Sequence, residues 1–321
     1  MDPREKALRG WVESFPYDRY RNYPGFPQEM ARRALMGVLL EEGAPVRKIW
    51  VGEDPSTGGL LRVVDLPSDE RIYNMRMGHL THVLGRIPPH SIRDELEDAG
   101  YRHVVTRVDA SDFTLQRRLL EEGFFLVDTL VTYITLPMSD PMEDRKRPSP
   151  DLPFVIRDYE PTDRSGVLEV TRRMYSRYPS RYHRDPFLRE HSAEVYTAWM
   201  ERYLDGEADK TLVAELEGQV TAFLSFRFDR RLHESTQIRC YGAGLGASSA
   251  QGRGAYSSLL YDAIRYGMGI DVRYGEFDTQ IDNYGVISLY HQLALRYVRA
   301  QHTFHLHLPP LAAPSAAHPR T

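Results

Sequence analysis

A glycine-rich turn, Gln251-Gly252-Arg253-Gly254-Ala255-Tyr256, carries the clearest chemical signal in this sequence. It follows a strand-like run and opens a helix-like run. Glycines allow a tight turn that directs several amide N–H groups into one concavity, and a helix N-terminus adds partial positive charge. The turn therefore predicts a phosphate cradle, to which Arg253 adds a charged donor. Taken alone, it is equally typical of a flexible strand-to-helix connection.

A second candidate pair follows downstream. Asn283 lies in the turn after a strand-like run, and Tyr290 lies in the next helix-like run. When a thioester acylates an amine, a thiolate leaves, and a nearby phenol can protonate it and stabilise the developing charge. A helical tyrosine is more often a packed residue, so the surrounding elements decide what this pair means.

Those elements alternate between hairpins and crossovers. Strands are expected at 154–157, on both sides of the Glu217-Gly218 turn within 211–228, and at 237–245, 274–280 and 299–308. Helices are expected at 162–178, 192–204, 256–267 and 286–295. The order predicts an α/β protein with a mixed sheet and helices on its faces.

The first half echoes the second. Residues 106–137 align with residues 279–309, and both read as a strand end, a helix, a strand and a closing Leu-Pro. We therefore predict two related domains, 1–138 and 154–309, joined by a charged, proline-rich linker at 139–153 and followed by a flexible tail at 310–321. The alignment sets Ala110 against Asn283 and Arg117 against Tyr290. The first domain has Pro88 and Pro89 where a glycine loop is needed, and prolines offer no N–H, so this domain is expected to be degenerate.

The order of elements and motifs resembles the GCN5-related N-acetyltransferases (GNAT). That family binds coenzyme A through a Q/R-x-x-G-x-G/A loop, and it carries an Asn and a Tyr that match Asn283 and Tyr290, the catalytic residues that the resemblance implies. The implied coenzyme contacts are Leu245, Gly246, Gln251, Gly252, Arg253, Gly254, Ala255 and Tyr256. An amide near Leu245 or Gly246 would hold the thioester carbonyl. The chain departs from the pattern at Tyr256, where the family has a small residue, and at 292–295, where it often has Lys-Leu-Gly-Phe.

The layout also resembles two-domain members of the dTDP-fucosamine acetyltransferase type. This implies acyl transfer from acetyl-CoA, or another acyl-CoA, to the amine of a nucleotide-linked deoxyamino sugar. An aromatic and basic segment would bind the acceptor through Tyr175, Arg177, Arg181, Tyr182 and His183, although such a segment is also typical of a solvated loop. The alternatives are another small amine, such as an aminophosphonate nucleotide or an aminoglycoside, and a coenzyme-binding regulatory protein without activity.

Composition and charge limit the classes of partner and the cellular location that the sequence allows. A net charge of −4 argues against nucleic-acid binding, and the sequence lacks an apolar run of membrane-spanning or signal-peptide length, so the cytoplasm is the expected location. The lone Cys240 reads as a small buried hydrophobe. His302 would face away from His305 and His307 on one strand, so no metal is expected. A homodimer is an option for the assembly.

Overall fold

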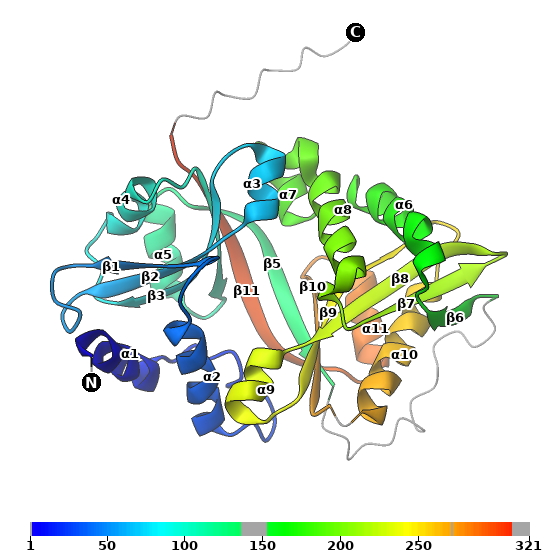
Figure 1. Cartoon of the computed structure of the whole chain (residues 1–321), viewed down its shortest axis with the longest axis horizontal. Helices are drawn as coiled ribbons and strands as arrows, with labels where there is room; N and C mark the ends of the chain where they lie inside the picture. Colours follow the sequence, from blue (N-terminus) through cyan, green and yellow to red (C-terminus); the bar gives the residue numbers. More distant parts are fainter. Residues whose placement is uncertain (1, 136–152, 271, 310–321) are drawn as a thin grey trace, which may run out of the picture.

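The computed structural model describes residues 2–135, 153–270 and 272–309. The predicted linker lies outside them except for Pro153, and the predicted tail lies wholly outside them. The N-terminal half occupies the left of Figure 1 and the C-terminal half the right, with β5 and β11 between them. None of the helices in the described residues is long and apolar enough to cross a bilayer.

A single 11-stranded sheet runs through both halves in the order β1-β2-β3-β4-β11-β5-β10-β9-β8-β7-β6. The first half supplies β1 (Val46–Val51), β2 (Gly59–Asp65), β3 (Met77–Gly85), β4 (His103–Asp109) and β5 (Phe125–Ile134). The second half supplies β6 (Val155–Asp158), β7 (Lys210–Leu216), β8 (Gln219–Phe228), β9 (Cys240–Ser248), β10 (Tyr274–Gln280) and β11 (Arg296–His307). The predicted mixed α/β sheet is confirmed.

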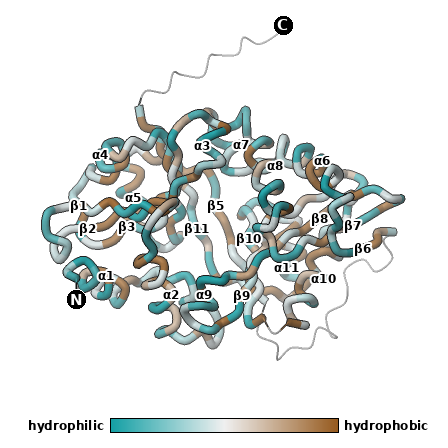
Figure 2. The backbone as a smooth tube through the Cα atoms, in the orientation of Figure 1, coloured by the Kyte–Doolittle hydropathy of each residue, from teal (hydrophilic) through white to brown (hydrophobic). Residues whose placement is uncertain are grey.

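Helices cover both faces of this sheet. The first half contains α1 (Pro3–Ser14), α2 (Gln28–Leu40), α3 (Pro67–Tyr73), α4 (Ser91–Asp98) and α5 (Phe113–Glu121). The second half contains α6 (Arg164–Tyr175), α7 (Arg181–Arg184), α8 (Ser192–Arg202), α9 (Arg230–Thr236), α10 (Ala255–Gly269) and α11 (Tyr284–Gln292), with short helical turns at Pro161–Asp163, Arg189–His191 and Tyr203–Glu207. Figure 2 shows hydrophobic stretches within the strands and helices of both halves.

The two halves exchange their last strands. β11 pairs antiparallel with β4 and β5, and β5 pairs antiparallel with β11 and β10. Each terminal strand therefore completes the other half of the sheet. On both sides of this centre the next pair is parallel, β3 with β4 and β9 with β10. The resulting pseudo-symmetry agrees with the sequence echo and with two related domains.

Two hydrogen bonds show which residues of the two halves are equivalent. The amide of Phe124 donates to the carbonyl of Leu119, and the amide of Leu295 donates in the same way to Tyr290. Leu119 is therefore the equivalent of Tyr290, and by the same offset Asp112 is the equivalent of Asn283. The predicted pairing with Arg117 and Ala110 was wrong by two residues, because sparse identities could not place the gap. The first half still has no phenol at the position of Tyr290.

Most predicted elements of the second half are confirmed within a few residues. Glu217 and Gly218 form the predicted turn with φ of 51° and 78°, as a two-residue hairpin requires. The sequence reading missed α9, whose first turn is capped by Asp229 through its bond to the amide of Leu232. Because α9 takes 230–236, β9 starts and ends later than expected.

A buried carboxylate holds the N-terminal segment against the C-terminal half. Glu276 on β10 is 5% exposed and accepts hydrogen bonds from Arg19 and from the Tyr23 hydroxyl. Burial alone would raise the pKa of Glu276, but the charges of Arg19 and Arg299 and these hydrogen bonds lower it below its usual value. The charged form is therefore favoured in the folded protein.

We expect Glu276→Gln to lower the free energy of unfolding at neutral pH by about 2 kcal/mol, since hydrogen bonds to a charged group are lost. A depressed carboxyl pKa stabilises above the unfolded value of 4.5 and loses that contribution as the pH falls below it. The difference between wild type and variant should thus shrink in acid. Urea unfolding at pH values from neutral to below 4.5 measures this difference in the free energy of unfolding. Glu29→Gln is the control, because Glu29 forms an exposed pair with Arg33. A constant difference at all pH values would contradict the assignment.

Candidate active site

A notch opens in the C-terminal half where two parallel strands separate. β9 and β10 pair only from Cys240–Gly242 to Tyr274–Glu276. Beyond this point β9 carries an irregularity opposite β8, between the pairs of Leu224 and Phe226. The strand ends beyond Gly242 and Glu276 thus leave backbone groups that do not pair with each other.

One amide of β9 points into this notch. The amide of Ser249 donates to the carbonyl of Thr221, so these two residues form a hydrogen-bonded pair of β8 and β9. From there, non-hydrogen-bonded and hydrogen-bonded pairs alternate along the two strands. By that alternation Gly246, opposite Leu224, directs its N–H and C=O away from β8. The carbonyl of Gly246 indeed accepts from the Tyr175 hydroxyl at 3.2 Å. The sequence predicts that the amide of either Leu245 or Gly246 binds the thioester carbonyl. The Leu245 amide donates to Ser225 Oγ at 3.1 Å, so the Gly246 amide is the candidate that can bind the carbonyl.

The glycine turn lies where the sequence predicts it, between β9 and α10. Gly254, with φ of 90°, precedes the first residue of α10, Ala255. Gly252 packs so tightly that an added Cβ would lie 2.4 Å from the carbonyl oxygen of Thr221. Within the described residues, no acceptor is found for the amides of Gln251, Arg253 and Gly254. This geometry suits an anion that gathers several amide donors at a helix N-terminus.

Two phenols meet beside the notch. Tyr290 on α11 is 1% exposed, and its hydroxyl donates to the carbonyl of Asp278 at 3.4 Å. Burial, the neighbouring Tyr256 and then Asp278 raise the pKa of Tyr290 well above its usual value. Burial also raises the pKa of Tyr256 to about 12. Both phenols thus keep their protons at neutral pH and can act as donors.

Tyr256 occupies the position where the family pattern has a small residue. Its ring lies against Gly246, where an added Cβ would meet Tyr256 Cε2 at 2.8 Å. The missing side chain of Gly246 therefore makes room for Tyr256. As a result, Tyr256, one of the predicted coenzyme contacts, lines the notch beside Tyr290, and the sequence did not show that these two phenols are neighbours.

Asn283 lies next to further tyrosines. Its Nδ2 donates to Thr279 Oγ1 at 2.9 Å and to the hydroxyl of Tyr178 at 3.5 Å. Tyr175 packs edge-on against Tyr178 and stacks on Tyr196 with ring centroids 3.9 Å apart. Asn283 thus ties the end of β10 to an aromatic wall built by α6 and α8. The sequence did not predict Tyr196 as a site residue, because only tertiary packing brings α8 next to Tyr175.

The other predicted acceptor residues are more dispersed. Arg181 and Tyr182 are buried and bond to each other, and the Tyr182 hydroxyl donates to Asp69 of α3. They connect the two halves of the molecule. Arg177 is exposed and His183 is half-buried, and within the described ranges neither side chain hydrogen-bonds to a residue of the notch. The part of these four residues in acceptor binding stays a prediction.

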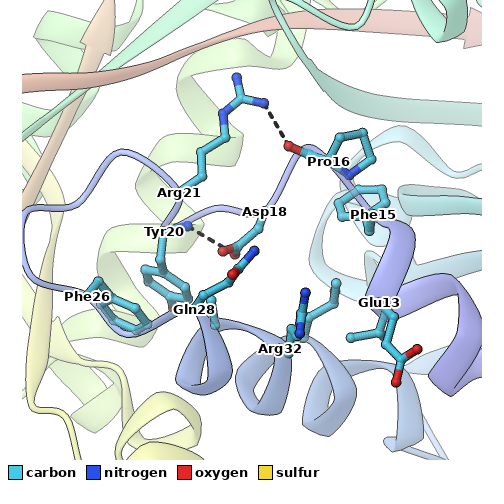
Figure 3. A pocket seen from close by; sticks show the side chains of 12 residues that line it. Glu13, Phe15, Pro16, Asp18, Tyr20, Arg21, Phe26, Gln28 and Arg32 are labelled. Atoms are coloured by element: carbon cyan, nitrogen blue, oxygen red, sulfur yellow. Dashed lines mark hydrogen bonds between the residues drawn. The ribbon is translucent and has the colours of Figure 1, made fainter.

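A separate cavity of about 240 Å³ lies between α1, α2 and the loop that joins them. Figure 3 shows Asp18, Tyr20 and Arg32 among the side chains that line it. None of the predicted site residues lines this cavity, so it is a different region from the one formed by the glycine turn, Tyr256 and Tyr290.

Comparison with known families agrees with this geometry. Residues 171–294 match the family model described as "Acetyltransferase (GNAT) family". The C-terminal half of this chain contains a GNAT domain. The matched range includes the notch, the glycine turn, Asn283 and Tyr290.

Similar proteins extend this picture. The chain is 26% identical over 201 residues to the spore coat polysaccharide biosynthesis protein SpsD of Bacillus subtilis, covering 59% of this chain and 58% of SpsD. A tandem GNAT protein from the clavulanic acid biosynthesis pathway matches with a TM-score of 0.58 and 12% identity, over 96% of this chain and 97% of its own. A glucosamine N-acetyltransferase region of a fungal β-N-acetylglucosaminidase matches with a TM-score of 0.58 and 14% identity, over 95% of this chain and 37% of its own. These structures confirm the fold with two GNAT-like halves.

Proposed function

We propose that this protein is an acyl-CoA-dependent N-acyltransferase. The observation that carries the proposal is the convergence of three groups on one notch: the inward Gly246 amide, the cradle at 251–254 and the buried Tyr290 phenol. Acyl-CoA supplies a thioester as the donor substrate. The cradle fits its diphosphate because, within the described part of the chain, the amides of Gln251, Arg253 and Gly254 have no acceptor, and the GNAT match to this region supports the same choice.

The reaction is direct transfer. The Gly246 N–H polarises the thioester carbonyl while an uncharged amine attacks its carbon. A C–N bond forms, the C–S bond breaks, and the electron pair leaves on sulfur. Tyr290 then gives its proton to the thiolate, and the amide nitrogen loses a proton to solvent, so Tyr290 is restored by a later proton exchange. The raised pKa of Tyr290 keeps the phenol protonated before each turnover.

The acceptor we favour is the amine of a nucleotide-linked amino sugar. Tyr175, Tyr178 and Tyr196 offer aromatic faces and hydroxyls, which suit a sugar ring. Beside Tyr196, burial and then the charge of Arg181 lower the pKa of Arg107. Two neighbouring guanidinium groups suit a diphosphate. SpsD is named as a spore coat polysaccharide biosynthesis protein, which supports the same class of acceptor.

The N-terminal half is proposed to bind no coenzyme. In its equivalent loop Pro88 and Pro89 lack N–H donors. The ring of Trp11 from α1 also packs on Gly85, where an added Cβ would lie 2.5 Å from Trp11 Cζ2. This half instead supplies β5 to the C-terminal sheet and Asp69 to the acceptor side.

Release of free thiol from acetyl-CoA, measured with a panel of amines, tests the proposal. Nucleotide-linked amino sugars should accelerate thiol release over the hydrolytic background, with an equal amount of acetylated product by mass spectrometry. Free aminoglycosides and aminophosphonate nucleotides serve as competing acceptors. Acetyl-CoA binding without transfer to any amine would instead favour a regulatory protein, in which Tyr256 obstructs the notch.

A further inference from the structure

Three imidazoles and one carboxylate converge at the join between the two halves. His103 lies on β4, directly opposite His307 on β11, and His305 lies two residues before His307 on the same face. Asp185, which follows α7, reaches this face from the C-terminal half. Asp185 Oδ2 lies 2.7 Å from His305 Nδ1 and 2.8 Å from His307 Nε2.

His103 is the least satisfied member of the group, since His305 and His307 each use one ring nitrogen on Asp185. It is 1% exposed, and neither ring nitrogen has a hydrogen-bond partner within the described residues. Its Nε2 lies 3.9 Å from Asp185 Oδ2. A buried imidazole without partners is costly, because it loses hydration and gains nothing in return. This nitrogen therefore points to a ligand held among His103, Asp185 and His307.

The carboxylate has only histidines as its side-chain partners among the described residues. Asp185 is fully buried, its Oδ1 accepts from the amide of Phe187, and within the described ranges no lysine or arginine hydrogen-bonds to it. One ligand atom from each of His103, Asp185 and His307 lies within 4.8 Å of the others. Tetrahedral Zn²⁺ with bonds of about 2.0 Å separates its ligands by roughly 3.3 Å, so side-chain shifts below an ångström suffice.

We propose that His103, Asp185 and His307 form a site for a divalent transition metal, with Zn²⁺ the best fit. Two imidazoles with one carboxylate favour zinc over magnesium or calcium, which prefer oxygen ligands. His305 orients the carboxylate of Asp185 through its Nδ1. Because the three ligands come from β4, β11 and the segment after α7, the bound ion would join the exchanged strand to both halves. The role is structural and separate from the acyl-transfer notch.

The test uses the full-length, untagged protein, stripped with EDTA and titrated with Zn²⁺ by calorimetry. We expect about one equivalent of Zn²⁺ to bind and to raise Tm. His103→Asn should abolish stoichiometric binding, and His305→Asn should weaken it roughly tenfold to a hundredfold. His302→Asn is the matched control, because His302 lies on the opposite face of β11 and contacts Thr129; it should bind like wild type.

Absence of stoichiometric binding to the wild type, or unchanged binding to His103→Asn, would overturn the proposal. If circular dichroism shows that His103→Asn does not fold, Co²⁺ added to the stripped wild type decides without a variant. Visible absorption of four-coordinate Co²⁺ that Zn²⁺ removes supports the site, whereas the spectrum of hydrated Co²⁺ contradicts it. Neither outcome depends on acyltransferase activity, so the two proposals fail independently.

Discussion

Replacement of Tyr290 by phenylalanine should lower kcat roughly tenfold to a thousandfold, because a positioned general acid is lost. The Kd for acetyl-CoA should change little, because the cradle at 251–254 is untouched. The reason is the position of the phenol: it is buried beside the notch and protonated at neutral pH. Steady-state kinetics with the best amine and calorimetric binding of acetyl-CoA measure the two effects separately.

Two neighbouring phenols serve as controls for Tyr290. Tyr133→Phe removes a hydroxyl that bonds to His291 Nε2 at 3.1 Å, and its ring lies 5.1 Å from that of Tyr290, yet kcat should stay near wild type. Tyr256→Phe removes the phenol that interacts with Tyr290. If Tyr256→Phe lowered kcat and Tyr290→Phe did not, the proton donor would be Tyr256 and our assignment would be wrong.

Replacement of Gly252 by alanine should weaken acetyl-CoA binding at least about tenfold, equivalent to about 1.4 kcal/mol. An added Cβ would lie 2.4 Å from the oxygen and 2.9 Å from the carbonyl carbon of Thr221. These are backbone atoms of β8, which is held between two neighbouring strands, so the turn has to move and its amides lose their common direction. The free energy of unfolding should fall by about 1–3 kcal/mol.

Gly285→Ala is the matched control for Gly252. Gly285 lies in α11 near the notch, and nothing lies within 4 Å of an added Cβ. Alanine should stabilise this helix by up to about 1 kcal/mol and leave acetyl-CoA binding unchanged. Thermal unfolding and calorimetry on both variants separate stability from affinity. Wild-type affinity in Gly252→Ala would contradict the cradle.

The order of elements was predictable because local signals are strong in the C-terminal half. The bounds of β10 and the turn at Glu217-Gly218 follow directly from residue types. The strand exchange was not predictable, since apolar periodicity shows that β11 is a strand but does not name its partners. The helix α9 was missed because it is short and polar and depends on its cap at Asp229.

Only those parts of the candidate site that consist of residues close together in the sequence could be predicted. The glycine turn and the spacing of Asn283 and Tyr290 are readable along the sequence. Tyr196 and the engagement of Leu245 by Ser225 depend on packing between distant elements. For the same reason the histidine pattern on β11 alone predicted no metal site, although the fold brings ligand atoms of His103 and Asp185 within 4.8 Å of His307 from other elements.

A crystal structure of the protein with bound acetyl-CoA tests the central claim most directly. We predict the diphosphate on the amides of Gln251, Arg253 and Gly254, the thioester carbonyl on the Gly246 N–H, and the sulfur within hydrogen-bond reach of the Tyr290 hydroxyl. Acetyl-CoA bound in the N-terminal half, or a Tyr290 hydroxyl that stays on the Asp278 carbonyl away from the sulfur, would contradict the account.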